Sequence, residues 1–127
     1  MTSDHFLTLL NAWRGVLWPD FVEHDGCVLR NELCGPAEQA YRDWLVQTGG
    51  DRRRVEAVMN HLHIADVLEG VVESPSREVI FTFGRLIRDL WTAKLSRDFP
   101  HRQFIVSFPE DHSDDLVDYE ITFYQAT

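Results

Sequence analysis

The sequence has few cysteines and no long apolar run, and each absence excludes a class of protein. Only Cys27 and Cys34 occur among 127 residues, whereas a secreted disulfide scaffold carries more cysteines for its length. The longest stretches without Asp, Glu, Lys or Arg are nine residues each, 5–13 and 57–65, and a membrane-spanning helix needs about 20 apolar residues. We therefore expect a soluble protein whose thiols are reduced.

Basic charge is also scarce. Twelve Lys and Arg residues stand against 21 Asp and Glu residues, which gives a net charge of −9. Nucleic-acid binding depends on neutralising phosphates with basic side chains, so nucleic acid is not expected as a partner. The N-terminus has no basic segment and carries Asp4. It does not have the pattern of a signal peptide, and we expect a cytoplasmic protein that makes no membrane contact.

The chain lacks the short sequence motifs that are typical of catalytic, phosphate-binding or metal-binding sites. It contains no G-x-S-x-G, no glycine-rich phosphate loop, no H-E-x-x-H and no C-x-x-C. We therefore expect no enzyme activity and no cofactor, and a function that consists of binding another protein.

Hydrophobic periodicity and turn residues predict an α+β fold. A length of 127 residues is typical of a single domain, here residues 1–127. Apolar residues at 3.6-residue spacing predict helices at about 4–17, 36–48, 52–68 and 75–98. Period-two alternation and turn residues predict hairpins at about 21–31 and 103–125, the first around Asp25-Gly26. We expect an antiparallel sheet built from the two hairpins and packed on the helices.

The helix predicted at 52–68 contains one ambiguous stretch. Residues 61–68 alternate like a strand, but they also continue the helical apolar stripe as far as Leu68. The longer periodicity favours a helix that ends near Gly70.

The C-terminal hairpin gathers acidic residues and is the main candidate site. From Gln103 to the end there are six carboxylates and no Lys or Arg. Such a negative face could protect an exposed strand edge, or it could attract a basic protein and accelerate its association. We take it as a docking surface for a basic partner such as a toxin, and the protein as an immunity- or antitoxin-like inhibitor. The candidate partner-binding residues are Glu110, Asp111, Asp114, Asp115, Asp118, Glu120 and Tyr124.

Two other clusters suggest weaker alternatives. Arg52, Arg53 and Arg54 lie where a helix N-terminus disfavours cations, and pairing of Arg52 with Glu56 would offset this cost. His61 and His63, with Asp66 nearby, are the types of residue that bind metals. On a helix, positions i and i+2 point apart, so these histidines could share a metal only on a strand. With the helix favoured, no metal site is expected, and a metal-binding protein or enzyme centred on His61 and His63 is an alternative function.

Exposed aromatic residues suggest a further kind of protein contact. Phe81 falls off the apolar stripe of the long helix, and Trp18 lies in a connection beside Pro19. Aromatic residues are enriched in interfaces, which is consistent with a homodimer. A secretion or assembly chaperone is the alternative binding function, and a continuous exposed apolar groove would favour it.

Overall fold

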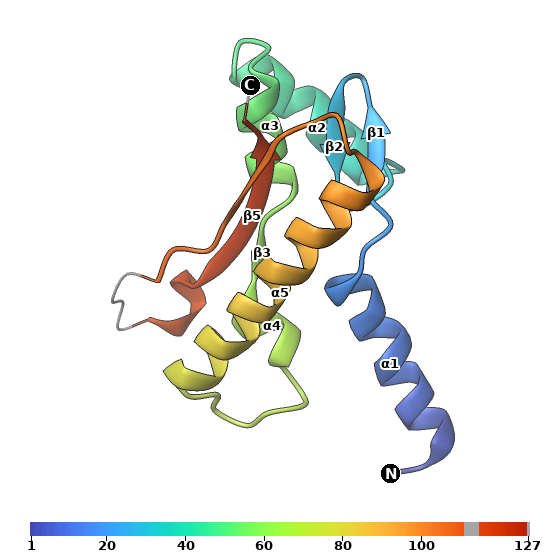
Figure 1. The fold of residues 1–127 in the computed structure, drawn as a ribbon, viewed down its shortest axis with the longest axis vertical. Coiled ribbons are helices and arrows are strands. Elements are labelled where there is room, and N and C mark those ends of the chain that lie inside the picture. The colour runs from blue at the N-terminus through green and yellow to red at the C-terminus, as the bar shows by residue number, and fades with distance from the viewer. Residues whose placement is uncertain (111–114, 127) are drawn as a thin grey trace.

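The computed structural model describes residues 1–110 and 115–126, and it confirms the α+β class (Figure 1). Over these residues no helix is long and apolar enough to cross a membrane. The helices are α1 (Ser3–Leu17), α2 (Pro36–Gln47), α3 (Arg52–Met59), α4 (Ile64–Leu68), α5 (Arg77–Asp98) and the 3₁₀ helix η1 (Leu116–Asp118); the strands are β1 (Val22–His24), β2 (Cys27–Leu29), β3 (Leu62–His63), β4 (Phe104–Ser107) and β5 (Glu120–Gln125).

The first hairpin forms as the sequence predicts. Asp25 and Gly26 both have positive φ, 53° and 85°, as a two-residue turn of this type requires. Val22 pairs with Leu29 and His24 with Cys27 in an antiparallel ladder. This ribbon is a separate two-stranded sheet rather than part of a larger one.

The second sheet has three strands in the order β3-β5-β4. The pairing of Phe104 with Gln125 and of Ser107 with Thr122 confirms the predicted C-terminal hairpin. Its second strand begins at Glu120, directly after η1 and one more residue. The third strand, β3, was not expected.

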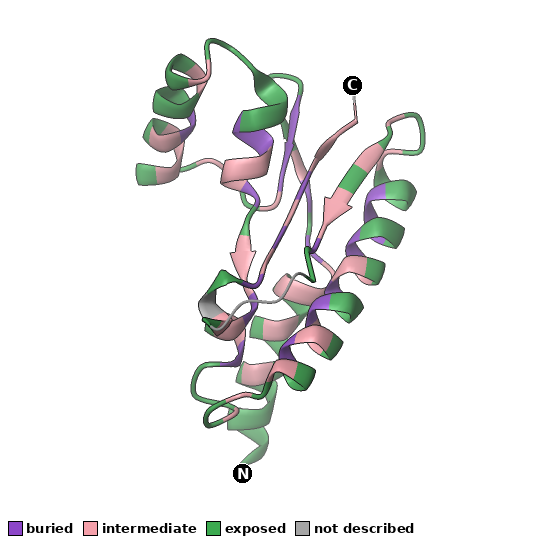
Figure 2. Ribbon diagram, turned by 90° about the vertical axis from the view of Figure 1, so that its left-hand side faces the viewer, coloured by how far each residue is buried: buried purple, intermediate pink, exposed green. Residues whose placement is uncertain are grey.

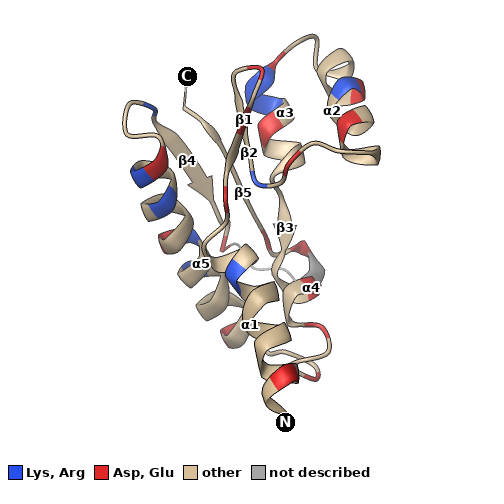
Figure 3. Cartoon of the chain, turned by 90° about the vertical axis from the view of Figure 1, so that its right-hand side faces the viewer, with Lys and Arg blue, Asp and Glu red and all other residues tan. Residues whose placement is uncertain are grey.

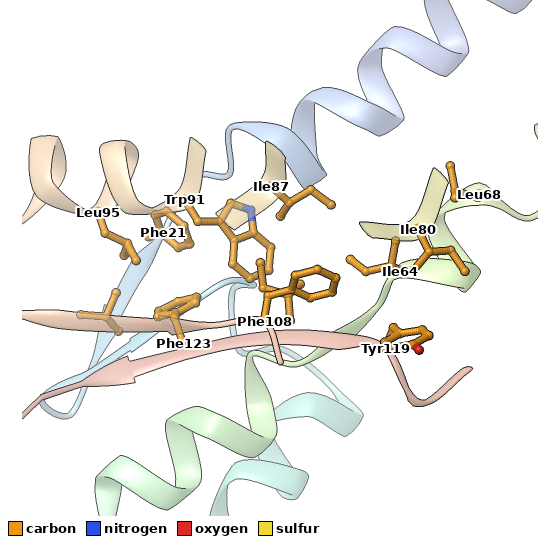
Figure 4. Close-up of a cluster of buried hydrophobic side chains, with 12 residues drawn as sticks. Phe21, Ile64, Leu68, Ile80, Ile87, Trp91, Leu95, Phe108, Tyr119 and Phe123 are labelled. Atoms are coloured by element: carbon orange, nitrogen blue, oxygen red, sulfur yellow. The ribbon is translucent and has the colours of Figure 1, made fainter. Parts of the chain in front are cut away.

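The long helix α5 supports one face of this sheet (Figure 2). Its buried side chains include Ile80, Ile87, Trp91 and Leu95. They pack against the sheet and the start of the first hairpin in the main apolar core, where aromatic rings meet edge to face (Figure 4). The Trp91 indole Nε1 also donates to the Val16 carbonyl at 2.6 Å, which ties α5 to the end of α1.

Two aromatic residues are less exposed than the sequence predicted. Phe81 is half-buried, with its ring 5.0 Å from that of Tyr119. Trp18 is also half-buried and lies 5.8 Å from the Lys94 ammonium. Both rings pack against other parts of the chain, so they do not form an exposed aromatic surface.

The helix predicted at 52–68 is interrupted, and this prediction is wrong. The helix ends at Met59, the chain is extended at β3, and α4 begins at Ile64. The cause is Asn60, which is fully buried. Its amide donates to the carbonyls of Val28 and Phe123, and its side-chain oxygen accepts from the Arg30 N–H. These tertiary hydrogen bonds satisfy backbone groups of two sheets and outweigh the local helical pattern.

A buried carboxylate on α3 makes a second set of such bonds. Glu56 accepts from the backbone N–H groups of Val28 and Gln125 at 2.8 and 3.0 Å. Its expected pairing with Arg52 is therefore wrong. Arg52 instead bonds to the carbonyl and carboxylate of Asp25.

Helix starts differ slightly from expectation. Thr2 caps α1 and Ser76 caps α5, so α1 begins one residue earlier and α5 two residues later than predicted. Ser74 has a positive φ of 49°, which is incompatible with a position at the start of a helix.

Candidate functional site

The acidic residues of the C-terminal segment do not form one continuous surface in the part that the structure describes. Asp111 and Asp114 lie outside the described residues. Glu110 bonds to the Arg85 guanidinium of α5. This hydrogen bond lowers the pKa of Glu110 and neutralises its charge within the protein.

The remaining members lie on different elements. Asp115 precedes η1 and Asp118 belongs to it, and both are exposed. Glu120 faces His63 across the strands, and the ring of Tyr124 lies 4.8 Å from the Arg53 guanidinium. Helix α3 also covers part of this side of the sheet, since Thr122 donates its hydroxyl hydrogen to the Ala57 carbonyl. Glu120 and Tyr124 share one side of β5, but Asp115 and Asp118 lie outside that strand, and a docking role for these residues stays a prediction.

The extended conformation of β3 brings the two histidines together. His61, His63 and Glu120 each offer a ligand atom, and these atoms all lie within 4.8 Å of one another. Asp66, which the sequence placed with the histidines, belongs to α4 and is exposed. It is not a member of the cluster found among the described residues. Glu120 takes its place through the pairing of β3 with β5.

Exposed apolar side chains on α1 and α5 are a feature that the sequence did not reveal. Helix α1 has no buried residue, and Phe6, Leu7 and Leu10 are 52%, 55% and 45% exposed. On α5, Val79 and Leu86 are 37% and 46% exposed. We call these five side chains the α1–α5 apolar face.

The two helices touch at one end of α1 and leave a hollow on α5. The rings of Trp13 and Phe83 lie 5.6 Å apart. Beside this contact is a hollow of about 310 Å³, lined by Glu78, Val79, Thr82, Phe83 and Leu86. All five lining residues belong to α5, and a small hollow with apolar walls can take a ligand or a partner's side chain.

Carboxylates lie at the same end of the molecule as this face. Asp4 occupies the first turn of α1, Glu73 the loop before α5, and Glu78 the first turn of α5 (Figure 3). All three are exposed, and no ion pair joins them to another residue within 1–110 or 115–126. The nearby Arg77 donates to the Tyr119 hydroxyl. The α1–α5 apolar face is therefore flanked by uncompensated negative charge.

The two cysteines lie in different environments. Cys27 is buried in strand β2 of the first hairpin, and Cys34 is exposed. Burial raises the pKa of the Cys27 thiol, and the nearby Glu56 carboxylate raises it further. Cys27 is thus a packing residue and not a reactive one.

Comparison with known proteins adds no relative. No family model, no curated protein and no solved structure matches this chain. The function therefore has to be inferred from the geometry described above.

Proposed function

We propose that this protein binds another protein through the α1–α5 apolar face. The observation that carries the proposal is a 15-residue helix, α1, with no buried residue and three large apolar side chains about half exposed. Single exposed apolar residues are ordinary, but several large apolar side chains exposed on one helix are typical of an interaction site.

The partner that fits is a segment with apolar and basic side chains. An amphipathic helix can place its apolar side against an exposed apolar helix surface. Basic residues next to that apolar side would meet Asp4, Glu73 and Glu78, and the net charge of −9 would steer such a partner toward the protein. A second copy of this chain would bring its own carboxylates to the same place, so a homodimer through this face is less favourable.

Capture of a segment is how a secretion or assembly chaperone works, and the apolar hollow favours this reading. An inhibitor that closes the active site of a basic toxin is the second candidate. It rests on the exposed carboxylates of Asp115 and Asp118. The two readings place the partner on different surfaces, so substitutions can separate them.

The test is affinity capture from the source cell with matched variants. Leu10→Ser combined with Leu86→Ser removes apolar side chains from the proposed surface. Val46→Ser is the control, because Val46 is 81% exposed on α2 and lies outside this face. We expect a basic protein that is captured by the wild type and by Val46→Ser, and at least tenfold less by the double variant. Capture should also fall as salt increases.

Equal capture by all three proteins would contradict the proposal. If Asp115→Asn with Asp118→Asn abolishes capture while the apolar double variant retains it, the acidic surface is the docking site and the inhibitor reading replaces the chaperone reading.

A further inference from the structure

The outward side of the β3–β5 pair carries a cluster that the proposed protein contact does not use. His63 and Glu120 are direct partners in the antiparallel register. The neighbouring pair, Leu62 with Ile121, alternates to the other side and packs in the main core. The two histidines and Glu120 therefore lie on the side of the sheet away from α5.

The spacing of these groups suits a small metal ion. The His63 Nε2 and Glu120 Oε2 atoms are 3.5 Å apart. Tetrahedral coordination with bonds of about 2.0–2.1 Å places neighbouring ligand atoms about 3.4 Å apart. His61 belongs to the same cluster, within the 4.8 Å that encloses all three ligand atoms. Small side-chain rotations would bring the three atoms to coordination distance.

The orientation of the His61 ring also suits metal binding. Its Nδ1 atom lies 2.5 Å from the Val58 carbonyl oxygen. Because a carbonyl can only accept, Nδ1 must carry the hydrogen, and the neutral ring then presents the Nε2 lone pair. Metal-binding histidines typically donate their other ring N–H to a carbonyl or a carboxylate in this way.

The surroundings leave room for a further ligand. A hollow of about 370 Å³ adjoins the cluster and is lined by Ala57, Val58, His61, Glu120 and Thr122. No Lys or Arg lines it, so no side-chain cation competes for Glu120 from within this hollow. The Thr122 hydroxyl donates to the Ala57 carbonyl, and this hydrogen bond joins β5 to α3 beside the hollow.

We propose that His61, His63 and Glu120 bind one Zn²⁺ ion, with water in the fourth position facing the hollow. Two imidazoles and one carboxylate are typical zinc ligands, whereas Mg²⁺ and Ca²⁺ prefer sites made of oxygen ligands. A set of three protein ligands leaves one position of the ion accessible. The site is independent of the α1–α5 apolar face, because it lies on the opposite side of the sheet.

Titration calorimetry with ZnCl₂ tests the site in untagged protein. The exposed thiol of Cys34 could bind zinc by itself, so all measurements use a Cys34→Ser background. We expect one zinc ion per chain. Single substitutions His61→Ala and His63→Ala should each weaken binding by at least about 100-fold, because changes in the outer shell alone cost about 10–100-fold. Glu120→Gln, which keeps the shape of the side chain, should also weaken it.

Two matched variants serve as controls. Asp66→Asn changes the nearby carboxylate that lies outside the cluster, and His101→Ala removes an exposed histidine in the turn after α5. Both should bind zinc like the parent protein. X-ray absorption of the zinc-bound protein should show nitrogen and oxygen ligands at about 2.0–2.1 Å and no sulfur at about 2.3 Å.

The absence of stoichiometric zinc binding would overturn the proposal. Unchanged affinity in His61→Ala and His63→Ala would overturn it as well. Urea unfolding shows whether each alanine variant folds. If one does not, the zinc affinity of Glu120→Gln decides, and an unchanged affinity would overturn the proposal.

Discussion

Helices α1 and α5 have similar apolar patterns but very different surroundings. Both carry large apolar side chains at helical spacing, yet α5 buries six residues and α1 buries none. The apolar side of α5 is covered by the sheet, α4 and the first hairpin, whereas α1 contacts the rest of the protein mainly near its C-terminal end (Figures 1 and 4). An amphipathic pattern therefore indicates that a helix has an apolar side, but not that the same chain covers it.

The largest effect is expected at the centre of the α5 interface. Trp91→Ala removes a fully buried indole and its hydrogen bond to the Val16 carbonyl. We expect a loss of about 3–5 kcal/mol in the free energy of unfolding. Urea unfolding measures this loss, with Trp44→Ala as the control because Trp44 is 36% exposed on α2. A similar loss in both variants would contradict the assignment of the core.

One glycine in each helix gives a sharper comparison. A Cβ atom at Gly84 of α5 would clash with the Phe108 ring, whereas nothing lies within 4 Å of one at Gly15 of α1. Gly84→Ala should cost about 1–3 kcal/mol through overpacking. Gly15→Ala should stabilise the protein by about 0.5–1 kcal/mol, because alanine favours the helix. Thermal or urea unfolding measures both changes in the free energy of unfolding. Changes of opposite sign would confirm that the two helices have different surroundings, and changes of equal sign would contradict it.

Removal of apolar side chains from the exposed face should change stability little. We expect Leu10→Ser with Leu86→Ser to alter the free energy of unfolding by less than about 1 kcal/mol, because both side chains are nearly half exposed in the isolated protein. Urea unfolding without partner measures this. A loss of several kcal/mol would mean that α1 packs more tightly than the structure shows.

The smallest effect is expected at the Glu110–Arg85 pair on the outer side of α5. Arg85 lowers the pKa of Glu110, so folding favours the ionised carboxylate. The stabilisation that this pair gives to the folded protein is present above the unfolded-state pKa of Glu110. It is lost as the pH falls through the lower folded-state pKa of Glu110. Glu110→Gln should therefore leave unfolding nearly unchanged at neutral pH and slightly reduce the acid sensitivity of the urea midpoint. A large change in the free energy of unfolding at neutral pH would show that this exposed ion pair stabilises the protein more than such pairs usually do.

The sequence predicted those parts of the fold that local signals determine. Asp25-Gly26 specifies its own turn, and the repeated apolar residues of α5 specify a long helix. The break after Met59 was missed because it depends on bonds from Asn60 to Val28 and Phe123, which are distant in the sequence. No local pattern contains this information.

The candidate sites depend even more on tertiary structure. Glu120 joins His61 and His63 only because β3 pairs with β5 in one particular register. The exposure of Phe6 and Leu10 could not be predicted, since their spacing is the same as that of buried residues. The sequence gives the number of carboxylates in the C-terminal segment, but this number does not reveal that Glu110 bonds to Arg85 in the folded protein.

The proposed protein contact is tested most directly by site-specific photo-crosslinking in the source cell. A photoreactive side chain replaces Leu10 on the α1–α5 apolar face or, as the control, Val46 on α2. The proposal predicts a defined adduct with one basic protein from position 10 and none from position 46. Equal labelling from both positions, or an adduct only with a second copy of this chain, would contradict it.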